Sequence, residues 1–208
     1  RDLLASLVAR YSPGAGFGDP RAGLAALAAF EATLHRTTSF DRFMRGDHDR
    51  LSDQQILGLH LFRTTARCAN CHMGPRLTDD EFHNIGLTYY GRQYEDLGRY
   101  TVTGDPADVG AFRTPSLRHV GETGPYMHNG MFETLREVVE HYDGAAEEFE
   151  GEWLGTLDDK VVRLNLTETE IDDLVAFLES LEGEPLDPSI STPPSLPPDS
   201  PFPETSPF

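Results

Sequence analysis

Cys68-Ala69-Asn70-Cys71-His72 is the stretch of this 208-residue chain that decides its fold. Its C-x-x-C-H spacing is the attachment signature of a c-type haem. Two thiols about one helical turn apart can each form a thioether to the edge of the porphyrin, and the imidazole that follows directly can reach the iron. The motif therefore predicts that Cys68 and Cys71 bind a haem covalently and that His72 is its proximal ligand.

A C-x-x-C pair also occurs in redox dithiols, disulfides and zinc sites. The chain has two cysteines in all, so it cannot supply a zinc site of four cysteines by itself. A thioredoxin-like motif follows a buried hydrophobic strand, and residues 62–67 make a poor one. These observations favour haem, and the absence of a second C-x-x-C-H in the sequence predicts one haem for this chain.

Composition limits the class of protein. Hydrophobic residues make up 38% and charged residues 25% of the chain, which is ordinary for a globular protein. The formal net charge of −18 argues against nucleic acid and anionic membrane surfaces, and suits a small redox protein as electron donor. No apolar run approaches the eighteen residues of a membrane-spanning helix, so we expect the chain not to be transmembrane.

Amphipathic patterns predict a mainly α fold. Apolar residues at helical spacing indicate short helices over residues 1–11 and 20–36, the second with an apolar face. Serine or threonine followed three residues later by glutamine or glutamate is a capping box, and three such boxes predict helix starts. These pairs are Ser52 with Gln55, Thr134 with Glu137, and Thr167 with Glu170. The first of these helices leads into the haem motif.

Long irregular segments separate the predicted helices. Residues 37–49 read as a polar loop, and residues 73–111 show no sustained periodicity, as expected of a loop that wraps a prosthetic group. In that loop His83 is expected to pack near a haem propionate. Nine of the fifteen prolines follow Gly183, which predicts an extended tail. We therefore expect a helical lead-in over residues 1–50, a cytochrome c-like haem domain over 51–183 and a Pro-rich tail over 184–208.

Three stretches resemble the C-terminal half of the bacterial dihaem cytochrome c peroxidases and their MauG-like relatives. They are residues 25–34, residues 68–87 and the long run from Phe112 to Tyr142, which matches F-x-T-P-x-L-R-x-V, T-x-P-Y-x-H-x-G and T-L-x-x-V-V-x-x-Y. The resemblance implies a cytochrome c-like domain holding the electron-transferring haem of an oxidoreductase that uses hydrogen peroxide. In the family a separate N-terminal half holds the peroxide-binding haem, so the resemblance implies such a domain or subunit as partner.

The sixth ligand of the iron is the main open choice. In the family this position is methionine in the peroxidases proper and tyrosine in the MauG-like members, and here it carries Tyr142. Met127 and Met131, which bracket a turn, and His128, which occupies a motif position, are the alternatives. A phenolate ligand lowers the reduction potential, whereas a thioether raises it.

The resemblance also allows a calcium ion bound through backbone carbonyls, at positions matching Thr123 and Pro125, with further ligands from the other half. Attachment of haem c outside the cytoplasm implies a periplasmic or otherwise exported protein. The chain starts without a methionine, and we expect either a leader removed by processing or a fragment of a longer polypeptide. Two alternatives to an oxidoreductase half remain, namely a monohaem electron-carrier cytochrome and a haem-bearing structural subunit of a larger assembly.

Overall fold

A computed structural model describes residues 20–87, 95–144 and 155–191 of the chain. It divides into two compact units, Thr38–Gly183 and a second one that joins Arg1–Thr37 to Glu184–Phe208. The helix predicted over residues 1–11, and the tail beyond residue 191, lie outside the described residues. The larger unit contains the haem motif.

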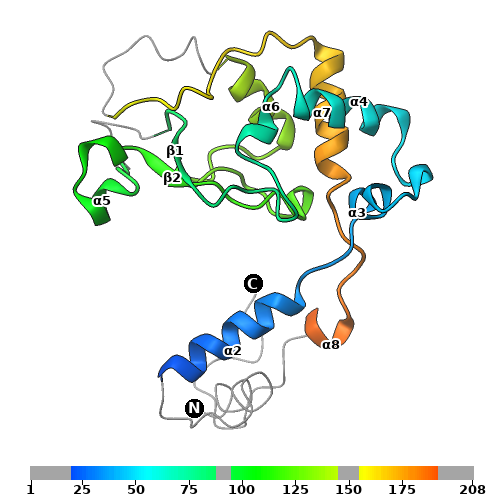
Figure 1. Ribbon diagram of the computed structural model, residues 1–208, viewed down its shortest axis with the longest axis horizontal. Coiled ribbons are helices and arrows are strands. Elements are labelled where there is room, and N and C mark those ends of the chain that lie inside the picture. The colour runs from blue at the N-terminus through cyan, green and yellow to red at the C-terminus, as the bar shows by residue number, and fades with distance from the viewer. Residues whose placement is uncertain (1–19, 88–94, 145–154, 192–208) are drawn as a thin grey trace. The chain divides into compact units, whose positions relative to one another are not determined.

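The larger unit is mainly helical with long connecting loops, as predicted, and it also contains one small sheet that was not predicted (Figure 1). Its α-helices are α3 (Ser39–Met44), α4 (Asp53–Arg63), α5 (Tyr100–Thr103), α6 (Leu135–Gly144) and α7 (Glu168–Glu179). Short 3-10 turns are η1 (His48–Arg50), η2 (Cys68–Asn70), η3 (Pro106–Asp108) and η4 (Val120–Glu122). The strands are β1 (Phe82–Asn84) and β2 (Ala111–Arg113).

All three predicted capping boxes begin helices. The side chains of Ser52 and Thr167 accept the backbone N–H groups of Gln55 and Glu170, and the N3 side chains bond back to the cap backbone. Thr134 makes the same reciprocal pair with Glu137 at the start of α6. Each box satisfies backbone donors that a helix start leaves open. Local sequence signals therefore set where α4, α6 and α7 begin.

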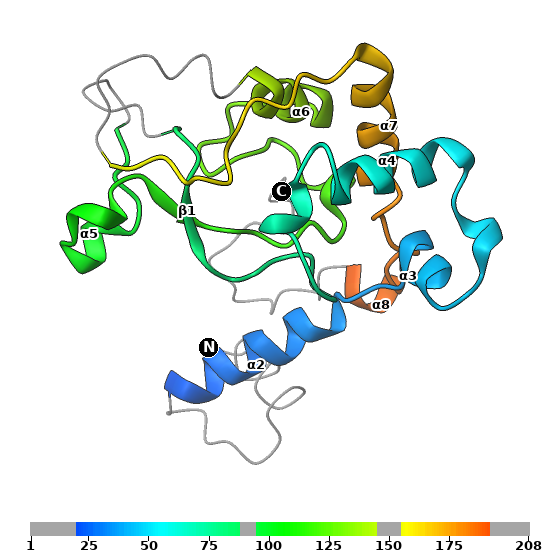
Figure 2. The same cartoon turned by 45° about the horizontal axis from the view of Figure 1, so that its top comes forward.

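The core forms where α4 crosses α7. The N-terminal end of α4 lies well away from the sheet (Figures 1 and 2). Phe177 is fully buried, and its ring meets the rings of Phe40 and Phe62 edge-on at 5.5 and 5.1 Å. Gly58 allows the close crossing, because a Cβ there would lie 2.8 Å from Cβ of Phe177. Ile171, Leu174 and Leu178 of α7 are buried in this core, and so is Leu181, which follows the end of the helix.

The prediction of a polar loop over residues 37–49 was wrong in part, because α3 lies within it. Thr38 accepts the N–H of Asp41 and the Asp41 carboxylate accepts the N–H of Thr38, so this segment has its own capping box. Asp41 also receives two hydrogen bonds from the guanidinium of Arg118, at 2.9 and 2.7 Å. Both side chains are 13% exposed, so the pair fixes α3 to the segment that precedes η4.

The long segment after the haem motif contains the small sheet. β1 and β2 pair antiparallel with His83 opposite Phe112. The remainder is loop with short helical turns, so the predicted irregularity holds over most of the described part of residues 73–111. The sheet presents His83 and Asn84 to the interior, where both are buried.

The smaller unit has two described helices, α2 (Pro20–Thr33) and α8 (Pro188–Ser191). The helix predicted over residues 20–36 ends at Thr33, and two leucines of its predicted apolar face, Leu24 and Leu27, are 72% and 49% exposed. Ala22 and Ala26 are its buried residues instead. Among the described residues, no helix has the length and apolar character that crossing a membrane requires.

Candidate haem site

The haem motif is positioned by the end of α4. After Arg63 the chain turns, Arg67 adopts a left-handed conformation with φ of 57°, and η2 begins at Cys68. The backbone N–H groups of Cys71 and His72 both donate to the carbonyl of Cys68, at 3.2 and 2.8 Å. This tight turn places both thiols and the imidazole along one wall.

That wall faces a cavity of about 430 Å³, within the range of cofactor sites. Both cysteines, His72 and Tyr142 line it. The apolar lining comes from α4, α6 and α7 and from the loops, and includes Phe62, Ile85, Leu117, Val120, Leu135, Val139, Leu174 and Leu178. Basic side chains at the cavity are Arg67, Arg113 and Lys160. An apolar cavity with a few cations suits a macrocycle that carries two carboxylates.

His72 has the arrangement of a metal-ligating histidine. Its Nδ1 lies 3.1 Å from the backbone carbonyl of Leu77, so Nδ1 carries the proton and Nε2 keeps a lone pair. Burial lowers the pKa of His72, against the opposing effect of the Leu77 carbonyl, which favours the neutral ring that a ligand requires. His72 therefore fits the role of proximal ligand.

The two cysteines fit thioether formation better than a redox dithiol. Neither forms a disulfide. Burial raises the pKa of the Cys68 thiol to about 12 and also raises that of Cys71. Reactive cysteines of dithiol oxidoreductases have lowered pKa values instead. Both sulfurs are thus held as neutral thiols at the cavity.

Tyr142, the predicted sixth ligand, lines the same cavity from α6. Burial raises the pKa of its phenol, and the two cysteines act on it in the same direction. His141, its neighbour on the helix, does not line the cavity but lies 5.1 Å, ring to ring, from Phe132. The structure therefore brings together Cys68, Cys71, His72 and Tyr142.

The alternative ligands differ in position. Met127 and His128 line the cavity, and the His128 ring stacks on Phe112 with centroids 3.6 Å apart. Burial lowers the pKa of His128. Met131 is 41% exposed and does not line the cavity, so the structure does not bring it to the other predicted site residues.

The two residues predicted to bind calcium, Thr123 and Pro125, also line the cavity. The hydroxyl of Thr123 donates to the carbonyl of Val120 at 3.2 Å. Their carbonyls stay candidates for a calcium whose remaining ligands would come from another domain.

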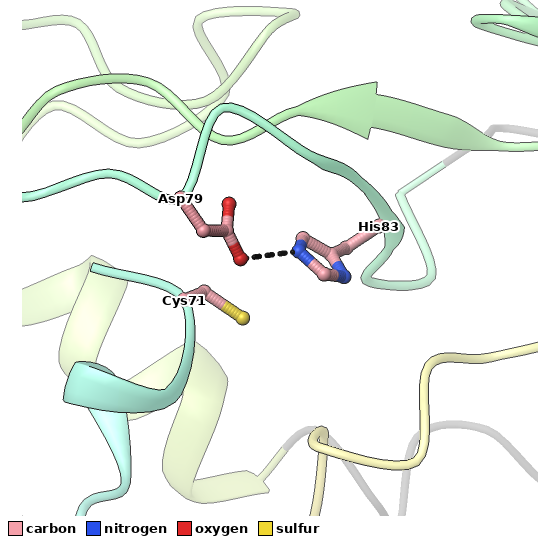
Figure 3. Close-up of side chains that lie close together, drawn as sticks. All are labelled: Cys71, Asp79 and His83. Carbon is pink, nitrogen blue, oxygen red and sulfur yellow. Dashed lines mark hydrogen bonds and ion pairs between the residues drawn. The ribbon is translucent and has the colours of Figure 1, made fainter. Parts of the chain in front are cut away.

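A cluster of charged side chains that the sequence reading missed lies beside Cys71 (Figure 3). His83 Nε2 is 2.9 Å from an Asp79 oxygen, and His83 Nδ1 is 2.5 Å from an Asp158 oxygen. Both ring nitrogens of His83 therefore have aspartate partners, and its position near a haem propionate stays a prediction. The sequence signal for this cluster is weak, because Asp79 and Asp158 are far apart in the chain.

Comparison with known proteins agrees with this site. The cytochrome c family model matches residues 57–182. The chain is 39% identical over 206 residues to cytochrome-c peroxidase IdrP1 of Denitromonas iodatirespirans, covering 84% of this chain and 53% of that protein. It is 40% identical over 164 residues to the methylamine utilization protein MauG of Methylorubrum extorquens, covering 77% of this chain and 44% of that protein. The chain spans about half the length of these relatives.

Solved structures give the same result for the fold. A MauG-like protein associated with microbial copper homeostasis superposes with a TM-score of 0.70 at 28% identity, over 89% of this chain and 62% of that one. The dihaem peroxidase BthA from Burkholderia thailandensis superposes with a TM-score of 0.61 at 24% identity, over 88% and 56%, which supports the fold alone.

Proposed function

The chain belongs to the cytochrome c family as the C-terminal haem domain of a dihaem cytochrome c peroxidase or MauG-like protein, and we propose that it is the electron-transferring half of an oxidoreductase that uses hydrogen peroxide. The observation that carries this proposal is the convergence of Cys68, Cys71, His72 and Tyr142 on one apolar cavity. When bound there, haem c supplies a one-electron couple.

The chain's own residues would divide the task. Cys68 and Cys71 would attach the macrocycle through their thiols. His72 would offer Nε2 to the iron, because the Leu77 carbonyl accepts a hydrogen bond from Nδ1. Tyr142 would supply the phenol oxygen as a further ligand of the iron. Its phenol retains a proton at neutral pH in the buried cavity, so ligation requires that this proton be lost. The apolar lining would limit the access of water to the bound group.

The partners follow from the same premise. A second haem half, in the same polypeptide or in another subunit, would bind peroxide, since relatives are about twice as long as this chain. A small basic or neutral redox protein would deliver electrons, attracted by the net charge of −18. Haem attachment would take place after export, in the periplasm.

The deciding experiment is a low-temperature electron paramagnetic resonance spectrum of the native ferric protein, with and without hydrogen peroxide, after mass spectrometry has established covalent haem. A low-spin signal accompanied by a high-spin signal that disappears with peroxide supports the proposal. A single low-spin signal that is the same with and without peroxide would instead indicate an electron-carrier cytochrome. Absence of covalent haem would contradict both.

Tyr142→Phe tests the sixth ligand. We expect the variant to lose the ferric spectrum of the native protein, because the oxygen that binds the iron is gone. Tyr126→Phe is the matched control, since Tyr126 lines the same cavity from the turn before α6. An unchanged ferric spectrum of Tyr142→Phe would remove Tyr142 from the coordination sphere and leave Met127 and His128 as candidates.

A further inference from the structure

His83 has two carboxylates on its ring, and this arrangement fixes its charge. A neutral imidazole has one N–H and one lone pair, so it can donate to one acceptor. Here Nε2 and Nδ1 each face an aspartate oxygen, at 2.9 and 2.5 Å. Hydrogen bonds from His83 and from backbone N–H groups hold the pKa values of Asp79 and Asp158 below the usual range, although burial opposes this. With both aspartates ionised, both contacts require an imidazolium.

The cluster is buried and joins three segments. The exposed fractions of the His83, Asp79 and Asp158 side chains are 9%, 13% and 18%. Asp79 follows the haem motif by seven residues, His83 is on β1, and Asp158 begins the segment that supplies several cavity-lining residues before α7. The backbone N–H of Asp158 also donates to the carbonyl of Asn84 at 2.9 Å. His83 therefore ties one wall of the cavity to the attachment loop.

The cluster also lies next to the attachment site. Donor atoms of Cys71, Asp79 and His83 are all within 4.8 Å of one another, and the Cys71 sulfur points toward the other two (Figure 3). His83 and Asp158 line the cavity directly, as does Lys160, whose backbone N–H donates to Asp158. Two carboxylates are thus balanced by an imidazolium and an ammonium, in a chain that carries a net charge of −18.

We propose that His83 is a positioning residue for the haem, an imidazolium held between Asp79 and Asp158 that sets the local charge beside the Cys71 thioether and thereby the reduction potential. This inference rests on the proposed haem site. A ferric haem has one positive charge more than a ferrous haem, so a nearby cation favours the ferrous form and a nearby carboxylate the ferric form. Removing members of the cluster should therefore move the potential in opposite directions.

The experiment measures the midpoint potential of the holoprotein and of three variants by spectroelectrochemistry. His83→Gln removes the cation and should lower the potential. Asp79→Asn and Asp158→Asn each remove a carboxylate and should raise the potential when it is measured at pH 5, where a histidine side chain is normally protonated and His83 keeps its charge. We expect each change to alter the reduction equilibrium constant by about threefold or more. His60→Gln, an exposed histidine on α4, is the matched control and should leave the potential unchanged.

The signs separate this role from a structural one. If the cluster only held the cavity wall in place, all three variants would admit water, favour the ferric form and lower the potential together. That result, or potentials equal to that of the unmodified protein, would overturn the proposal. If His83→Gln does not fold, a rise in both asparagine variants still supports it, and a fall in either contradicts it. A protein without covalent haem would contradict the proposed function instead.

Discussion

Gly58→Ala should weaken the haem domain, because Gly58 lies where α4 touches α7. A Cβ added at Gly58 would overlap the carbonyl oxygen of Asp173 and lie 2.6 Å from its carbonyl carbon and 2.8 Å from Cβ of Phe177. Carbon atoms in contact prefer separations of about 3.5–4.0 Å, so the helices would have to move apart by roughly 1 Å. That movement would loosen the packing around Phe177, which is now fully buried.

The magnitude follows from two opposing effects. Overpacking a core typically costs about 1–3 kcal/mol, and alanine gains about 1 kcal/mol over glycine inside a helix. The overlapped atoms belong to the backbone of α7, which cannot rotate away as a side chain can, so the cost lies at or above the upper end. We expect a net loss of about 2 kcal/mol in the free energy of unfolding, and a Tm lower by roughly 4–8 °C.

Urea unfolding of the holoprotein, followed by circular dichroism and by the haem absorbance, measures this loss. Gly144→Ala is the matched control, because Gly144 also lies in a helix and a Cβ there meets nothing within 4 Å. The control should stay within about 0.5 kcal/mol of the unmodified protein. Equal stability of the Gly58→Ala and Gly144→Ala variants would refute the close crossing of the two helices.

Two further changes test the polar contacts of the domain. The Arg118 guanidinium holds the pKa of Asp41 well below its usual range, so this pair stabilises the fold above the unfolded pKa of about 3.9 and loses that effect as pH falls toward the lower folded value. The Asp41→Asn variant should therefore unfold more easily than the unmodified protein at pH 7, and should lose less stability between pH 5 and pH 2. Urea titrations at a series of pH values measure this, and parallel pH dependences of the two proteins would contradict it. Thr167→Ala should cost about 1 kcal/mol, because its hydroxyl caps α7, whereas Thr167→Ser should be near neutral. Thermal unfolding compares the two, and equal losses would argue against the cap.

What the sequence could predict was local in the chain. A capping box needs two residues three positions apart, and the haem motif spans five residues. The roles of Ser52 and Thr167 as N-caps, and of Cys68 in haem attachment, could therefore be predicted from neighbouring residues. α3 was missed because its box has aspartate rather than glutamate or glutamine at the third position, in Thr38 and Asp41. The prediction that Tyr142 is the sixth ligand came from the family resemblance. Residue spacing alone could not have placed Tyr142 at the cavity.

Two polar contacts of the domain could not be predicted, because they join residues far apart in the chain. His83 and Asp158 are 75 residues apart, and Arg118 and Asp41 are 77 apart. No periodicity encodes such pairs. Each contributes only modestly to stability, since a hydrogen bond to a charged group is worth about 1.5–3 kcal/mol.

The pair of His83 and Asp158 nevertheless supplies charged groups that face the cavity. α4, α6 and α7 fix where the macrocycle can bind, and they do so with apolar side chains that carry no charge. Strand β1 places His83 at the cavity, and the loop before α7 places Asp158 and Lys160 there, where a unit charge acts through a medium far less polarisable than water. Helices of the same kind with different loop residues would hold a haem equally well and give it a different potential. On this proposal, β1 and the irregular segments, which the helical pattern leaves unspecified, therefore adjust a reduction potential that the ligands of the iron set first.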